Sequence, residues 1–112
     1  MNYIVIAVVL VLLYAIYQRR EGFDNKKSLV LFYAPWCGHC KALKPEWDKV
    51  ESKYRNNATV DVKKVNCDEH PDEAKKHGVS GYPTIILFTN GTKKIYGDDR
   101  TAESIEKFIV EN

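Results

Sequence analysis

Charge is missing from the first 17 of the 112 residues, although the whole chain carries 17 Lys and Arg and 15 Asp and Glu. Cysteine is also scarce: three residues are too few for a small domain held together by several disulfides. A net charge of only +2 excludes the strongly basic surface typical of nucleic-acid binding. A chain of this length has room for one domain, and 45% hydrophobic residues are too many for a disordered chain.

An uncharged apolar run fills residues 3–17 and ends at Gln18-Arg19-Arg20. Counted from Met1, 17 helical residues measure about 25 Å, at the short end of what crosses a hydrocarbon layer of about 30 Å. The run lacks the positively charged start and the small residues at a cleavage site that mark a secretory signal peptide. We therefore expect a single-pass membrane anchor over residues 1–17, in preference to a cleaved signal or a buried helix.

Positive charges follow this run at Arg19, Arg20, Lys26 and Lys27. Positive flanks favour the cytosolic side, so the charge rule predicts a cytosolic catalytic domain, while a lumenal one stays open. Residues 18–28 are polar and predict a juxtamembrane linker to a domain over residues 29–112.

Strand and helix patterns alternate after the linker. Leu29–Ala34 is an unbroken apolar run, typical of a strand buried on both faces. Apolar residues then recur at helical spacing from Leu43 to Tyr54, which predicts a helix ending near Arg55, and Pro45 should kink it.

The rest of the chain predicts an edge strand, a short helix, a β-hairpin and a final helix. The edge strand covers residues 60–65, and the short helix begins at Pro71 and is closed by Gly78. Strands 84–88 and 93–96 are joined by Asn90-Gly91, and the final helix presents Ala102, Ile105, Phe108 and Ile109 on one face. The order β-α-β-α-β-β-α predicts an α/β sandwich with a four-stranded mixed sheet.

Two cysteines lie where the first of these strands passes into a helix. Cys37 and Cys40 are separated by Gly38 and His39. The free N–H groups and positive dipole end of a helix N-terminus stabilise a thiolate, so we expect a lowered pKa at Cys37. A protonated His39 would add to this and make a disulfide between the two cysteines more oxidising. Cys40, one turn further on, should be shielded and able to attack a mixed disulfide on Cys37.

Other uses of these cysteines fit less well. A structural zinc site needs a second ligand pair, and Cys67 with His70 is only an approximate one. Inert core cysteines seldom flank a Gly-His turn, whereas Cys67 alone reads as a small apolar residue at a strand end. We therefore expect a redox pair and no metal or organic cofactor.

The run Phe32-Tyr33-Ala34-Pro35-Trp36-Cys37-Gly38-His39-Cys40-Lys41, followed by Gly81-Tyr82-Pro83-Thr84, resembles the catalytic domain of protein disulfide isomerases in the thioredoxin superfamily. The resemblance covers roughly residues 28 to 112. It implies a thioredoxin-like fold in which Pro83 is cis, faces the cysteines, and presents the backbone of Tyr82 to a substrate strand beside Trp36. It also implies that Arg100 can approach the buried cysteine and lower its pKa; a solvated loop charge is the other interpretation of Arg100.

Two departures from this family matter. Leu31 stands where the family usually has a buried acid, and Lys64 aligns with the lysine that would pair with that acid, so we expect Lys64 to face solvent. Deprotonation of Cys40 would then depend on Arg100, water or a substrate group. The family's opening strand and helix also have only the eleven linker residues available, so we expect a domain shortened at its N-terminus.

Together these features predict a membrane-anchored thiol–disulfide oxidoreductase that acts on protein or peptide cysteines, as an oxidase, isomerase or reductase, with a separate oxidase or reductase as redox partner. The alternative is a thioredoxin-fold module that binds peptides as a chaperone or scaffold with weak redox turnover. The Gly-His pair between the cysteines favours the less reducing end of this class, and so oxidation or isomerisation.

Overall fold

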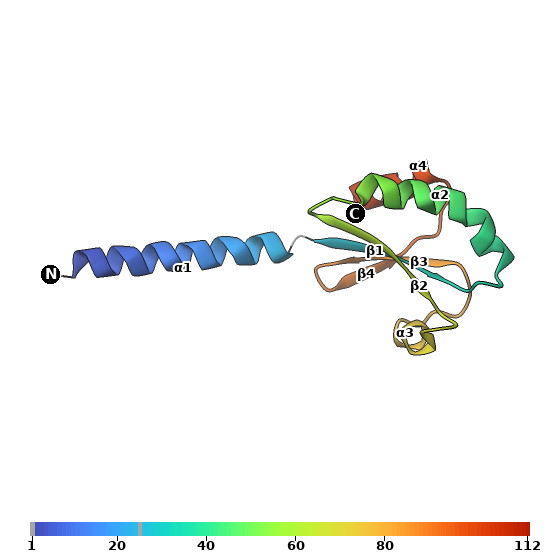
Figure 1. Cartoon of the computed structure of the whole chain (residues 1–112), viewed down its shortest axis with the longest axis horizontal. Coiled ribbons are helices and arrows are strands. Elements are labelled where there is room, and N and C mark those ends of the chain that lie inside the picture. Colours follow the sequence, from blue (N-terminus) through green and yellow to red (C-terminus); the bar gives the residue numbers. More distant parts are fainter. Residues whose placement is uncertain (1, 25) are drawn as a thin grey trace.

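A long helix and a four-stranded sheet divide the chain into two parts (Figure 1). This computed structural model describes residues 2–24 and 26–112, and only the backbone of residues 18–24. Helix α1 (Tyr3–Asp24) extends away from the sheet and its covering helices, so the two parts share little surface.

The apolar side chains of α1 are exposed. The large hydrophobic residues among residues 3–17 range from 47% exposed at Val9 to 86% at Tyr3. Within the part of the chain that the structure describes, no helix combines the length and the apolar character needed to cross a membrane. The predicted single-pass anchor over residues 1–17 is therefore not supported. The helix also continues to Asp24, through most of the segment that we predicted to be a linker.

The sheet has the strand order β2-β1-β3-β4. Its strands are β1 (Lys27–Tyr33), β2 (Val60–Asn66), β3 (Thr84–Thr89) and β4 (Thr92–Ile95). Strand β1 runs parallel to β2 and antiparallel to β3, and β3 and β4 form an antiparallel hairpin. The predicted four-stranded mixed sheet is confirmed, with β2 at one edge and β1 in the interior.

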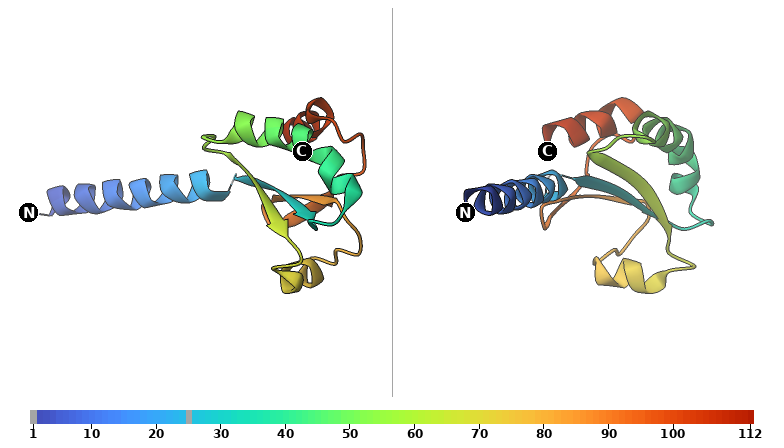
Figure 2. Two further views of the ribbon diagram at one scale, coloured as in Figure 1. Left: turned by 45° about the vertical axis from the view of Figure 1, so that its right-hand side comes forward. Right: turned by 60° about the vertical axis from the view of Figure 1, so that its left-hand side comes forward.

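Helices cover both faces of the sheet. Helices α2 (Gly38–Tyr54) and α4 (Ala102–Glu111) lie on one face, and the short α3 (Pro71–Lys76) lies on the other (Figure 2). The predicted β-α-β-α-β-β-α order holds from residue 27 onward. Figure 1 shows that α2 is bent, and Pro45 inside this helix removes a backbone hydrogen bond, which accounts for the predicted kink.

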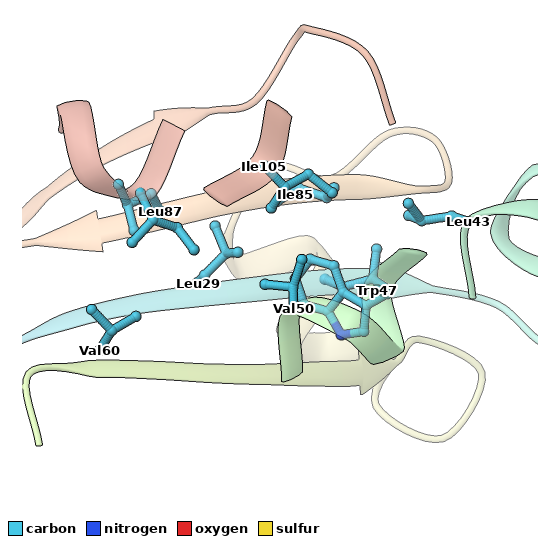
Figure 3. Packing of buried hydrophobic residues seen from close by; sticks show 10 residues of the cluster. Leu29, Leu43, Trp47, Val50, Val60, Ile85, Leu87 and Ile105 are labelled. Carbon is cyan, nitrogen blue, oxygen red and sulfur yellow. The ribbon is translucent and has the colours of Figure 1, made fainter. Parts of the chain in front are cut away.

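The alternation of side chains along β1 divides the core in two. Leu29 and Leu31 point toward α2 and α4, where they pack in a cluster with Trp47, Ile105 and six other buried residues (Figure 3). Val30 and Phe32 point to the opposite face and pack with Cys67, Ala74 and Ile86. Successive residues of a strand face opposite sides, so an unbroken apolar run is what a strand covered on both faces requires.

Local sequence signals form the turn of the hairpin, as predicted, and the start of α4. Asn90 and Gly91 both have positive φ, at 47° and 80°, as the tight turn of a β-hairpin needs. The Thr101 hydroxyl accepts a hydrogen bond from the Ser104 backbone at 3.2 Å and caps α4.

Candidate active site

The site forms where β1 ends and α2 begins. Ala34 is buried, and its carbonyl accepts a hydrogen bond from the Cys37 N–H at 3.1 Å, which closes the turn between the two elements. Cys37 is the N-cap of α2 with extended backbone angles (φ −77°, ψ 118°). Its sulfur accepts a hydrogen bond from the Cys40 N–H at 3.2 Å. A thiolate at this position is thus stabilised by a helix N-terminus, as the sequence predicted.

Cys37 is the more acidic of the two thiols. Burial alone would raise its pKa, since the side chain is only 6% exposed. A hydrogen bond with the Cys40 thiol, backbone N–H groups of Cys40 and His39, and the positive charge of Arg100 outweigh this and hold the pKa of Cys37 below its ordinary value.

The pKa of the Cys40 thiol is shifted in the opposite direction. Burial, followed by the hydrogen bond with Cys37 and the negative charge there, raises the pKa of Cys40 to about 11, although the Ala34 backbone and Arg100 oppose the change. Both thiols are free in this structure. Cys37 therefore loses its proton before Cys40 does, which makes Cys37 the better nucleophile of the pair.

The loop before β3 contacts the cysteine pair from the other side. The Tyr82–Pro83 peptide is cis, as the family resemblance implied. The Cys37 thiol lies 3.5 Å from the Tyr82 carbonyl and donates to it. Cys37 and Tyr82 are 45 positions apart in the chain, so this contact depends on the tertiary fold.

Trp36 forms an exposed aromatic surface beside this contact. Its ring is 67% exposed and meets Tyr82 edge-on, with ring centroids 5.9 Å apart. Its indole N–H donates to the Asp68 carboxylate at 3.2 Å. We did not anticipate Asp68 from the sequence, and its place just after the end of β2 was the one available signal. The arrangement holds an apolar ring in water next to the reactive sulfur, where a peptide can cover it.

Three further residues predicted for the site, Gly38, His39 and Arg100, are exposed. Gly38 is the first residue of α2, and a side chain added there would meet no atom within 4 Å, so packing does not require glycine. His39 is exposed and acts on Cys37 through its backbone N–H; the sequence had suggested its imidazole. Arg100, in the loop before α4, is exposed, yet its charge lowers the pKa of both cysteines.

A cavity of about 260 Å³ lies behind Cys40. Leu31 lines it, so the apolar replacement of the family's acid borders the buried sulfur. Lys64 is exposed, as predicted, and pairs with Leu31 in the β1–β2 register, but its side chain also lines this cavity together with Asp48. The sequence analysis did not single out Asp48, which lies eight residues beyond Cys40 on α2.

The third cysteine lies apart from this chemistry. Cys67 is 3% exposed in the core of the opposite sheet face, and burial raises its pKa. Among the side chains that the structure describes, no three His, Cys, Asp or Glu residues are grouped so that they could hold a metal ion.

A thiol of lowered pKa at a helix N-terminus, hydrogen-bonded to a buried partner of raised pKa, defines a site for thiol–disulfide exchange. Residues 10–111 match the family model described as Thioredoxin, and the chain therefore belongs to the thioredoxin family, a family of thiol–disulfide oxidoreductases. The match begins at residue 10, inside α1, so it does not support the predicted shortening of the domain at its N-terminus.

Curated relatives with high identity to this chain are named as protein disulfide isomerases. The chain is 48% identical over 96 residues to "Probable protein disulfide-isomerase A6" of Medicago sativa, covering 83% of this chain and 26% of that protein. It is 44% identical over 103 residues to "Protein disulfide isomerase-like 2-1" of Oryza sativa subsp. japonica, covering 90% and 28%. The chain thus spans about a quarter of the length of these curated relatives.

Solved structures agree with this assignment. The first thioredoxin domain of mouse protein disulfide-isomerase A4 superimposes with a TM-score of 0.69 at 38% identity, covering 82% of this chain and 66% of that one. Human ERp44 in a zinc-bound form gives a TM-score of 0.67 at 32% identity, covering 81% and 27%. The thioredoxin-like fold predicted from the sequence is therefore confirmed.

Proposed function

We propose that this chain oxidises, reduces or rearranges disulfides of client proteins through Cys37 and Cys40. The observation that carries the proposal is the opposite pKa shift of two hydrogen-bonded thiols, lowered at Cys37 and raised to about 11 at Cys40. This difference supports the proposed roles, in which Cys37 reacts first with the client and Cys40 resolves the intermediate.

The reaction then runs through a mixed disulfide. In the reducing direction, the Cys37 thiolate attacks a client disulfide, one client sulfur bonds to Cys37, and the other leaves as a thiolate. Cys40 loses its proton and attacks Cys37, which forms the Cys37–Cys40 disulfide and releases the second client thiolate. In the oxidising direction the same steps run in reverse, and the client dithiol gives up the two electrons.

The surface around Cys37 supports a peptide client. Trp36 offers an exposed ring at the edge of Tyr82, and the Tyr82 carbonyl reaches the Cys37 sulfur. We propose that an extended client segment lies across Trp36, Tyr82 and Pro83, with its cysteine against Cys37. The positive charge of Arg100 helps Cys40 lose its proton.

Trapping the intermediate tests the proposal. In Cys40→Ser the resolving thiol is absent, so incubation with an oxidised, unfolded client should accumulate one mixed disulfide per chain, seen as a larger band on non-reducing gels. Cys37→Ser/Cys40→Ser should accumulate none, and Cys67→Ser on the Cys40→Ser background should trap as well as Cys40→Ser. No trapping at all while client still binds would support the alternative, a peptide-binding chaperone or scaffold module with weak redox turnover. Trapping through Cys67 would contradict the roles proposed for Cys37 and Cys40.

We propose oxidation or isomerisation as the main direction, because a Gly-His pair between the cysteines favours the less reducing end of this class. Two-cysteine sites range from about −270 mV in thioredoxin to about −180 mV in disulfide isomerase. Equilibrating the protein with glutathione buffers of known ratio gives the potential. A value near that of thioredoxin would reverse the direction proposed here.

We also propose that residues 3–17 attach the domain to a membrane. The support is a charge-free run whose large apolar side chains are all at least 47% exposed. The full chain should float with liposomes after alkaline carbonate washing, whereas Leu10→Asp/Leu13→Asp should not. In sealed vesicles, labelling of Cys37 with an impermeant thiol reagent then tests the cytosolic orientation predicted from the charges. A wild-type chain that stays with the soluble fraction contradicts the attachment.

A further inference from the structure

The cavity behind Cys40 joins the buried sulfur to a charged wall. Its apolar lining includes Leu31, Ala34 and Trp47, and its charged lining consists of Lys41, Lys44, Asp48 and Lys64. A volume of about 260 Å³ is many times what one water molecule needs, and the charged side chains supply polar partners for water. The cavity can therefore hold a chain of water molecules that begins at Cys40.

Cys40 needs a proton acceptor at one particular moment. When it attacks the mixed disulfide, the Cys37 sulfur is already bonded to the client and cannot take the proton. The leaving client thiolate forms only as the attack proceeds. The Cys40 thiol is 7% exposed, which keeps bulk hydroxide away from most of its surface. The acceptor must therefore be reached through the cavity.

The residues around the cavity leave one candidate. Lysine side chains are ammonium groups near neutral pH and have no lone pair to accept a proton. Leu31 is apolar, and Tyr33 contributes a phenol, not a carboxylate. Asp48 is the one carboxylate among the residues that line this cavity, and no hydrogen bond or ion pair within the described part of the chain occupies it.

We propose that Asp48 accepts, through water in this cavity, the proton that Cys40 releases when it resolves the mixed disulfide. The inference rests on the proposed function and adds a residue to it. Eight residues separate Cys40 from Asp48 on α2, about 12 Å along the helix axis, so the transfer is relayed by water. Lys44 and Lys64 line the same cavity. The positive charge of Arg100, in the loop before α4, acts on Cys40 and favours the thiolate that forms.

The resolving step moves one proton and one pair of electrons. The Cys40 thiol gives its proton to a water molecule, and the last water of the chain protonates Asp48. The Cys40 sulfur bonds to the Cys37 sulfur and is oxidised, while the bond from Cys37 to the client sulfur breaks and that sulfur is reduced. The client leaves as a thiolate, and Asp48 returns its proton to solvent.

A chromogenic aromatic disulfide separates the two cysteines in one measurement. One equivalent added to the reduced full chain, in mild detergent, releases one coloured thiolate when Cys37 attacks and a second when Cys40 resolves. The first phase is the internal control for Cys37. Asp48→Asn removes the carboxylate at constant shape, Asp48→Glu restores it, and Asp72→Asn removes an equivalent exposed carboxylate on α3.

The proposal predicts a particular pH profile for the second phase. With Asp48 as the base, the rate should be nearly independent of pH from about 6 to 8; in Asp48→Asn it should rise about tenfold per pH unit, because only hydroxide then removes the proton. At pH 6.5 Asp48→Asn should be at least about tenfold slower, and the two rates should converge above about pH 10. Asp48→Glu should restore the flat profile and Asp72→Asn should keep it.

If Asp48 acted only through its negative charge, Asp48→Asn would lower the pKa of Cys40 and make the second phase faster, not slower. A second phase in Asp48→Asn that is as fast as wild type or faster, a glutamate variant as slow as the asparagine, or an equal slowing of the first phase would overturn the role of Asp48. Absence of a second phase in the wild type would instead contradict the proposed function.

Discussion

The hydrogen bond between the two thiols should set much of the acidity of Cys37, and replacing Cys40 tests this. In Cys40→Ala the thiol donor is gone, while the backbone N–H of residue 40 still points at the Cys37 sulfur at 3.2 Å. A hydrogen bond to a charged group contributes about 1.5–3 kcal/mol, and one pKa unit corresponds to about 1.36 kcal/mol. The pKa of Cys37 should therefore rise by about one to two units.

Cys40→Ser is the matched control, because its hydroxyl can donate the same hydrogen bond. Either substitution admits more water beside Cys37, and that reduced desolvation works toward a lower pKa in both variants, so the difference between alanine and serine isolates the donor. The thiolate can be titrated by its ultraviolet absorbance, with the rate of iodoacetamide alkylation as an independent check. If the alanine and serine variants titrate together, the side-chain hydrogen bond does not set the acidity of Cys37.

Three further predictions concern stability. The pKa of Cys40 is raised from 9.0 to about 11 in the folded state, so the unfolded state releases this proton first as the pH rises. The free energy of unfolding of the reduced protein should therefore fall by about 3 kcal/mol between pH 9 and 11. Urea unfolding at pH 8 and 11 should show a smaller loss of stability in Cys40→Ser than in wild type, and an equal loss would contradict the raised pKa of Cys40. Thr101→Ala removes the cap on the Ser104 N–H and should lower the free energy of unfolding by about 1 kcal/mol, with Thr101→Ser close to wild type. Ile105→Ala, at a fully buried position, should cost about 2–5 kcal/mol in the same measurement, whereas Val110→Ala, 73% exposed on the same helix, should change little.

Several parts of the fold could be predicted because their cause is local. The apolar run of β1 requires burial on both faces, the spacing of Leu43 and Trp47 marks the inner face of α2, and Asn90-Gly91 adopts the positive φ angles of a hairpin turn. The cysteine pair was also readable, since a helix N-terminus acts on whichever residue begins it. In contrast, the sequence did not show that α1 continues to Asp24, because polar residues can extend a helix as well as end it.

The origin of the acidity of Cys37 shows the limit of such reasoning. Sequence reasoning assigned it in part to the His39 imidazole, whereas the structure shows the His39 backbone N–H, the Cys40 thiol and Arg100 acting on the sulfur. Which part of a residue faces a neighbour depends on the path of the backbone through the turn. Arg100 follows Cys37 by 63 positions in the chain and approaches it only because β3 and β4 return the chain to the site.

What the residue order determines by itself is the redox pair, the strand and helix periods that give the four-stranded sandwich, and the charge-free start of the chain. Contacts between distant segments decided the rest: the Tyr82 carbonyl at the Cys37 sulfur, the Asp68 carboxylate at the Trp36 ring, and the cavity that brings Asp48 and Lys64 to the side of Cys40. The physical reason is that short-range periodicity and turn chemistry act along the backbone, whereas desolvation, cavities and charge–charge interactions depend on distances through space.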